Sequence, residues 1–156
     1  RHDSLIAKVR NAGARIMLIS DGDVSGVMAT SEEESGVDMY LGSGGAPEGV
    51  LAAAALRCIG GQMQGRLLFR NDDERARAQR CGIEDFDRKY DLLDLAKGNV
   101  MFAATGVTNG SMCRGVRRFR DGAETHSVVM RSQTGTIRHI STVHNFERKQ
   151  GFDTTA

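Results

Sequence analysis

The first third of the chain alternates two patterns of apolar residues. Stretches with apolar residues three or four positions apart, which favour helices, alternate with short runs that are apolar throughout. Such runs are typical of parallel strands, because these strands are buried on both faces. We expect helices and strands in turn over residues 3–12, 14–20, 24–30, 37–41 and 46–58. This alternation predicts a parallel sheet with helices packed on its faces.

The remaining two thirds of the chain have a different pattern. We expect short or charged helices over residues 72–80 and 92–96. We expect strands over residues 64–69, 99–105, 115–119, 126–131 and 136–143. The last two strands are joined by a short turn that contains Gly135, which indicates a β-hairpin. The expected fold class is α/β, with a largely parallel sheet and carboxyl-terminal antiparallel strands, in one domain over residues 1–156.

Composition narrows the classes of function. The chain has 156 residues and 21 Lys and Arg against 20 Asp and Glu, and its net charge of +1 gives no reason to expect a nucleic-acid partner. No apolar stretch approaches the roughly 20 residues that a membrane span needs. The three cysteines fit no zinc-ligand spacing, so we expect reduced thiols packed as small apolar side chains in a cytoplasmic protein. The chain begins Arg1-His2-Asp3, without an initiator Met, and we expect a fragment.

Two carboxylates flank a glycine directly after the first apolar run. Asp21 and Asp23 have only Gly22 between them. One of the two acids is explained by a turn in which Asp23 caps the following helix. Both acids together suggest a site, in which they accept hydrogen bonds from sugar hydroxyls or in which Asp21 is a nucleophile. The second possibility follows from a partial similarity to haloacid-dehalogenase-type phosphatases, which have Thr or Val where this chain has Ser25.

A glycine-rich loop, residues 42–49, follows the second apolar run. Pro47 stands where a dinucleotide-binding fingerprint needs glycine, and Val50 and Leu51 stand where a P-loop needs Lys and Ser or Thr. What remains is a glycine turn at a helix N-terminus, whose free N–H groups suit a phosphate oxygen. Glu48 in this turn is either an acid that favours the helix dipole or a ligand for Mg²⁺ or Mn²⁺. If the two expected strands are neighbours, this loop and the Asp-Gly-Asp turn face the same crevice.

These loops and their surroundings resemble the carboxyl-terminal half of class II fructose-1,6-bisphosphatases. The similar stretches read GARIMLISDGDVSGVMAT, SGVDMYLGSGGAPEGVLAAAALRCIGGQMQGRLL, FAATGVTNG and THSVVMRSQTGTIRHI. The resemblance as a whole extends from Arg1 to about Arg148. In cyanobacteria the family also acts on sedoheptulose 1,7-bisphosphate. The resemblance implies an inositol-phosphatase-like, metal-dependent and lithium-sensitive phosphatase whose fold is a layered α/β sandwich. Such an enzyme releases the 1-phosphate of fructose 1,6-bisphosphate by attack of a metal-activated water, in gluconeogenesis or the Calvin cycle.

The resemblance also implies roles for particular residues. The implied substrate contacts are Arg1, Asp21, Gly22, Asp23 and Gly45. Arg1 matches the last residue of a Lys-Pro-Arg stretch of the family, and Glu48 matches a ligand for Mg²⁺ or Mn²⁺. On this reading the two acids hold hydroxyl groups of the sugar bisphosphate, and no residue of this chain is the catalytic base.

The family's other metal ligands lie in an amino-terminal half that this chain lacks, and they include a motif of the type Asp-Pro-Ile-Glu-Gly-Thr. Glu48 alone cannot supply the roughly six oxygen ligands that Mg²⁺ prefers. We therefore expect the chain by itself to be a poor catalyst or none, and to form a homo-oligomer or to pair with the missing half. Two alternatives stay open: a non-catalytic module that binds a sugar phosphate or serves assembly, and a phosphatase that forms an aspartyl-phosphate on Asp21.

Overall fold

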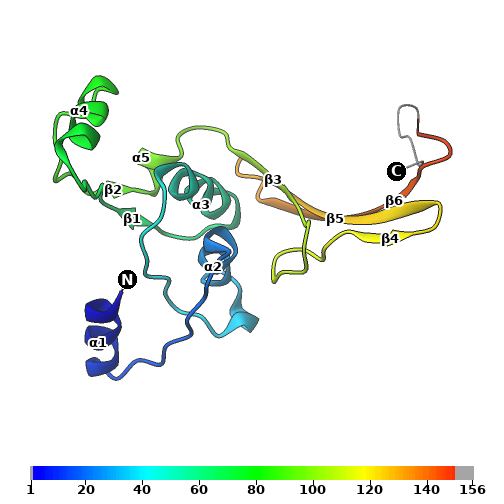
Figure 1. Ribbon diagram of the computed structural model, residues 1–156, viewed down its shortest axis with the longest axis horizontal. Helices are drawn as coiled ribbons and strands as arrows, with labels where there is room; N and C mark the ends of the chain where they lie inside the picture. The colour runs from blue at the N-terminus through cyan, green and yellow to red at the C-terminus, as the bar shows by residue number, and fades with distance from the viewer. Residues whose placement is uncertain (1, 150–156) are drawn as a thin grey trace.

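The computed structural model describes residues 2–149 and has a helical part from which an antiparallel sheet extends (Figure 1). The helices are α1 (Asp3–Asn11), α2 (Asp23–Ala29), the 3₁₀ helix η1 (Glu33–Ser35), α3 (Ala46–Ile59), α4 (Asp72–Arg80) and α5 (Leu92–Leu95). The strands are β1 (Gln64–Gly65), β2 (Tyr90–Asp91), β3 (Met101–Thr105), β4 (Arg117–Phe119), β5 (Gly122–Arg131) and β6 (Thr136–Asn145). The mixture of helices and strands confirms an α/β protein at this coarse level.

The strands of residues 2–149 pair antiparallel throughout. β1 and β2 form a two-stranded sheet, and β5 is the central strand of a four-stranded one. β6 pairs along the whole of β5, while β3 and β4 share the other side of β5. The expected β5–β6 hairpin is confirmed, and its turn contains Gly135 with φ 58, a left-handed conformation that glycine adopts without strain.

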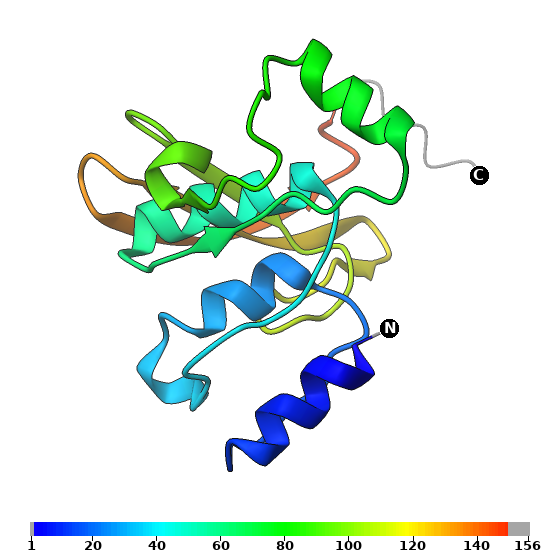
Figure 2. The ribbon, with the colours of Figure 1, turned by 90° about the vertical axis from the view of Figure 1, so that its left-hand side faces the viewer.

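α3 lies at the centre of the packing, beside α2 (Figure 2). Pro47 occupies its first turn, where the missing N–H is not needed, and Gly60 ends it with φ 95. One core cluster joins α3 to α2 and the sheet through Met28, Ala55, Cys58, Phe102, Val128 and Met130. A second cluster joins α3 to α2 through Val27, Ala52 and Leu56. α3 therefore packs against both α2 and the larger sheet, and its small alanine side chains allow both to lie close to the helix.

The strands expected over residues 14–20 and 37–41 do not form, and the prediction of strand structure there is wrong for this chain. Both segments are extended, but no strand within residues 2–149 pairs with them. Their outer side chains therefore stay in solvent, with Met17 71% and Met39 70% exposed. The expected parallel sheet is accordingly not confirmed, since every observed pairing is antiparallel.

The three cysteines are free, but they are not all packed as expected. Cys58 is buried in α3, its Sγ donates a hydrogen bond to the Val100 carbonyl over 3.6 Å, and burial raises the pKa of its thiol. Cys113 is half-buried, whereas Cys81 is exposed, so the packing prediction is wrong for Cys81. Within residues 2–149 no helix combines the length and the apolar character that crossing a bilayer requires.

A polar network joins three strands of the larger sheet. The Arg117 guanidinium on β4 donates to Glu124 Oε2 on β5, through Nε at 3.0 Å and Nη2 at 2.8 Å. Ser141 on β6 donates to Glu124 Oε1 at 2.9 Å. These hydrogen bonds favour the charged carboxylate, those from Arg117 most, and hold the pKa of Glu124 below its ordinary 4.5.

This network predicts acid sensitivity that depends on Glu124. Because the folded pKa is the lower one, the contribution of Glu124 to stability is fully present above about pH 4.5 and is lost as the pH falls through the folded value. Glu124→Gln should therefore reduce the loss of stability on acidification, as measured by urea unfolding between pH 7 and pH 3. Glu84→Gln, at an exposed site, is the matched control. Identical pH profiles for wild type and Glu124→Gln would contradict the prediction.

Alanine substitutions at two glycines should change the stability of the fold in opposite directions. A Cβ at Gly122 would overlap the His144 carbonyl oxygen across the β5–β6 ladder, so Gly122→Ala should destabilise the fold by about 1–3 kcal/mol. Gly49 lies inside α3 with no atom near its missing Cβ, so Gly49→Ala should stabilise it by about 0.5–1 kcal/mol. Urea unfolding followed by circular dichroism checks both. Equal midpoints for the two variants would show that the close approach at Gly122 is not a constraint.

Candidate functional site

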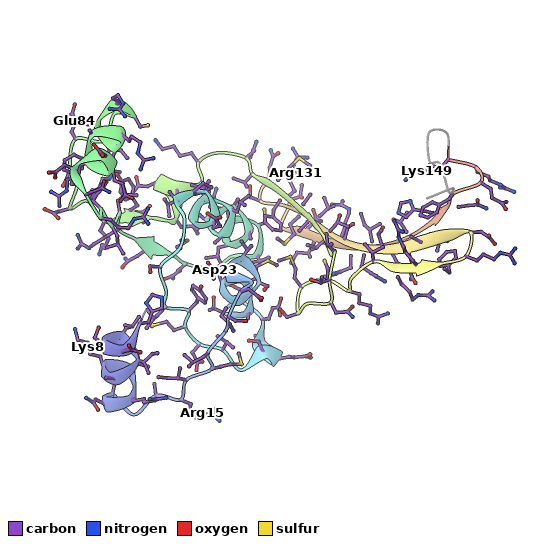
Figure 3. All side chains as sticks on the ribbon, in the orientation of Figure 1. Lys8, Arg15, Asp23, Glu84, Arg131 and Lys149 are labelled. Carbon is purple, nitrogen blue, oxygen red and sulfur yellow. The ribbon has the colours of Figure 1, made fainter. Side chains whose placement is uncertain are left out.

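The Asp-Gly-Asp turn and the glycine loop lie against each other. The Tyr40 hydroxyl donates a hydrogen bond to Asp23 Oδ1 over 3.0 Å, and Asp23 stands at the first residue of α2 (Figure 3). The other oxygen of that carboxylate lies beside Gly44, where a Cβ would be 3.0 Å from Asp23 Oδ2. The two loops that the sequence placed in one crevice are therefore in contact, although neither is preceded by a paired strand.

The backbone of the turn explains why the Asp23 carboxylate can reach the glycine loop. Gly22 is the N-cap of α2 with φ 77, a left-handed conformation that favours glycine. Its carbonyl accepts hydrogen bonds from the Gly26 N–H at 2.9 Å and the Ser25 hydroxyl at 2.8 Å. No side chain caps α2, so the expectation that Asp23 is the helix cap is wrong. Its carboxylate instead points to the glycine loop, and Asp21 before it is exposed to solvent.

Glu48 and Gly45 form the second part of the site, at the N-terminus of α3. Glu48 is exposed in the first helical turn, and its carboxylate folds back over Gly45. A Cβ at Gly45 would overlap Glu48 Oε2, so any other residue there would displace the carboxylate. Glu48 therefore lies where the helix dipole favours a negative charge and where it can also reach a ligand at the helix end. The geometry leaves both interpretations of Glu48 open.

The side chains present do not form a metal site by themselves. Among residues 2–149 no group of three or more His, Cys, Asp or Glu side chains is arranged to hold a metal ion. One carboxylate supplies at most two of the roughly six oxygens that Mg²⁺ prefers. The donor set around Glu48 therefore does not fit a bound divalent cation without ligands from elsewhere.

Five of the six residues predicted to bind substrate or metal lie within residues 2–149, and they fall into two adjoining groups. Gly22 and Asp23 belong to the turn that meets Gly44, while Gly45 and Glu48 lie against each other one residue further on. Asp21 lies at the exposed start of the turn, and Arg1 lies outside the described residues. Their roles in binding stay predictions.

Sequence reasoning missed Tyr40, whose hydroxyl fixes Asp23. The available signal was a tyrosine inside an apolar run, since a half-buried phenol normally finds a hydrogen-bond partner. Sequence reasoning also missed a hollow away from these loops. It is an open cleft of about 540 Å³ over β5 and β6, where His126 Nε2 lies 3.5 Å from Glu124 Oε1 and the loop around Met112 forms one wall.

Comparison with known proteins identifies the family. The family of bacterial fructose-1,6-bisphosphatases, glpX-encoded, matches residues 1–144, and the chain belongs to this family. A D-fructose 1,6-bisphosphatase class 2/sedoheptulose 1,7-bisphosphatase of Microcystis aeruginosa is 44% identical over 161 residues, which cover 95% of this chain and 47% of the relative. A protein of the same name from Synechococcus elongatus is 44% identical over 160 residues, covering 94% of this chain and 46% of that relative. The chain thus spans about half the length of the curated relatives it matches.

The contact between the two loops predicts a measurable role for the Tyr40 hydroxyl. Tyr40→Phe keeps the ring on Gly26 but removes the donor to the Asp23 carboxylate, and should destabilise the fold by about 0.5–1.5 kcal/mol. Tyr90→Phe, which keeps the ring that stacks under Arg88, is the control and should have less effect. Urea unfolding of both variants measures the difference. A Tyr40→Phe midpoint equal to wild type would show that the hydrogen bond does not join the loops.

Proposed function

We propose that this chain is the sugar-phosphate-binding part of a metal-dependent sugar bisphosphatase. The complete enzyme hydrolyses the 1-phosphate of fructose 1,6-bisphosphate, and also acts on sedoheptulose 1,7-bisphosphate, as the names of the cyanobacterial relatives suggest. The observation that carries the proposal is the contact of the Asp-Gly-Asp turn with a glycine loop at the N-terminus of α3. The Asp23 carboxylate lies beside the loop that leads into α3. Carboxylates accept hydrogen bonds from sugar hydroxyls, and N–H groups at a helix N-terminus suit phosphate oxygens, which supports the proposal.

Each part of the contact has a distinct task in this proposal. Asp21 is exposed and accepts hydrogen bonds from sugar hydroxyls, while Asp23 is held in place by Tyr40. Gly45 carries no side chain, so a substrate can approach the backbone directly at the start of α3. The free N–H groups of the first turn then face the phosphate, and the helix dipole favours its negative charge. Arg1 is a further substrate contact in the proposal.

The complete enzyme, in this proposal, uses Mg²⁺ or Mn²⁺. Glu48 provides one ligand, and the remaining ligands come from outside residues 2–149, because the described side chains form no ligand cluster. The layered α/β sandwich with a parallel sheet is likewise assigned to the complete enzyme. The three free cysteines suit a reducing compartment such as the cytoplasm.

A second function is favoured because residues 2–149 contain no cluster of metal ligands. Sugar-phosphate binding without catalysis needs only hydrogen-bond acceptors, such as the carboxylates of the turn, and donors, such as the N–H groups at the start of α3. The two functions differ in their need for metal. A binding module retains the sugar phosphate without metal and never releases phosphate, whatever polypeptide is added to it.

Binding of fructose 1,6-bisphosphate tests what both functions share. Isothermal titration of this chain should show binding, and Asp21→Ala should weaken it at least tenfold, because the variant removes a charged acceptor without altering the core. Asp121→Ala removes an exposed carboxylate at a distant turn and serves as the control. We expect no phosphate release by the chain alone with Mn²⁺. Absence of binding, or an equal effect of both variants, would contradict the proposed site.

A further inference from the structure

The open cleft over β5 and β6 takes no part in the proposed function. We name it the β5–β6 cleft. Its floor comes from residues of these two strands, and one wall comes from the loop of residues 110–114. Its volume of about 540 Å³ lies within the roughly 300–1,000 Å³ that is typical of pockets for small molecules. The cleft is therefore large enough to hold a metabolite.

The register of the sheet places two imidazole rings on the same face. His126 on β5 pairs with Ser141 on β6, and His139 lies two positions before Ser141 on β6. Because side chains two positions apart on a strand point to the same face, His126, His139 and Ser141 share one face. Val128, two positions after His126, belongs to the core cluster that joins this sheet to α3. The sheet extends past α3 (Figure 1), so the cleft lies beside α3 on the face that the helix packs against.

The wall of the cleft is fixed by the fold of its loop. The Gly115 N–H donates a hydrogen bond to Asn109 Oδ1 over 2.9 Å, which ties the two ends of the loop together. Met112 and Cys113 pack against the core cluster around α3. Arg114 follows them directly and lines the cleft from this ordered backbone. A ligand that binds to a preformed wall loses less conformational entropy on binding than one that must order a loose loop.

The charges that line the cleft favour an anion. Glu124 is the only acid within residues 2–149 that lines it. Glu124 Oε2 accepts both hydrogen bonds from Arg117, and Oε1 lies 2.9 Å from Ser141 Oγ and 3.5 Å from His126 Nε2. The charge of Arg117 therefore offsets that of Glu124, and the charge of Arg114 makes the cleft positive.

Three groups that line the cleft have nitrogen atoms without a partner. Within residues 2–149, no hydrogen bond or ion pair involves the Arg114 guanidinium, the His139 ring or Nδ1 of His126. A guanidinium presents N–H groups in a planar fork, and an imidazole that binds a proton presents an N–H on each nitrogen. Three such groups match the three terminal oxygens of a phosphate monoester better than the two oxygens of a carboxylate.

We propose that the β5–β6 cleft binds the phosphate group of a small molecule through Arg114, His126 and His139. This site is separate from the Asp-Gly-Asp turn and does not depend on the proposed function. The phosphate group belongs either to an organic ester or to free phosphate, and the cleft has room for the remainder of an ester.

Titration of this chain with glycerol 3-phosphate and, separately, with inorganic phosphate tests the site. Nuclear magnetic resonance of the ¹⁵N-labelled chain follows the imidazole signals of its four histidines. We expect the signals of His126 and His139 to shift, and that of His144, on the opposite face of the sheet, to stay. Tighter binding of the ester assigns the site to organic phosphates, and equal or tighter binding of inorganic phosphate assigns it to the free ion. Either result supports the proposal.

Two variants identify the donors. Arg114→Gln and His139→Gln should each weaken binding of the tighter of the two probes, the first by roughly tenfold, because each removes a donor at an exposed position without altering the core. Arg118→Gln is the matched control, since it removes the same charge from an exposed residue of β4 that pairs with Ala123 and so lies on the opposite face. Circular dichroism checks that all three variants are folded.

Three results would overturn the proposal. The first is that neither probe shifts the signals of His126 and His139. The second is that Arg118→Gln weakens binding as much as Arg114→Gln does. The third is that Asp21→Ala removes the response of the two histidines, because the cleft would then not be a separate site. If the chain shows this response but does not bind fructose 1,6-bisphosphate, the cleft is supported and only the proposed function is contradicted.

Discussion

The structure depends on the close packing of one helix with small side chains. Among residues 2–149, five of the twelve buried apolar residues belong to α3, and two of them, Ala53 and Ala55, have no exposed surface. Alanine lets the axis of α3 approach α2 and the sheet closely, and leaves little room for anything larger. Because most of these core side chains of α3 are small, the contacts of α3 determine both the orientation of α2 and the position of the glycine loop. The candidate site is consequently a product of helix packing rather than of a sheet edge.

Local chemistry made much of the fold predictable. The helix expected over residues 72–80 is α4, and the Asn71 side chain caps it by accepting the Glu74 N–H. The helix after the glycine loop begins and ends where Pro47 and Gly60 indicate, apart from one residue at its end. The carboxyl-terminal strands and their hairpin were predictable because their apolar residues alternate and their turn contains Gly135. These features depend on residues close together in the chain.

The segments before the two loops were not predictable in the same way. Apolar residues on both faces of residues 14–20 are typical of a strand that is covered on both faces. The pattern does not indicate which segments cover it. Tyr40 was missed for a related reason, because its partner Asp23 lies 17 positions away and only packing on Gly26 brings them together. The residues of the site could be named from motifs, whereas the contact that joins the two loops required the structure.

The connection of four residues, 132–135, between β5 and β6 has a consequence for the order of folding. Closing so short a loop costs little entropy, so the ladder between these strands can form before other parts of the chain meet. The core cluster that contains Ala55, Phe102 and Val128 brings together positions 47 and 73 residues apart, and forming it has the larger entropic cost. The hairpin is thus able to serve as an early template onto which α3 docks late, and the two loops acquire their contact only in that last step.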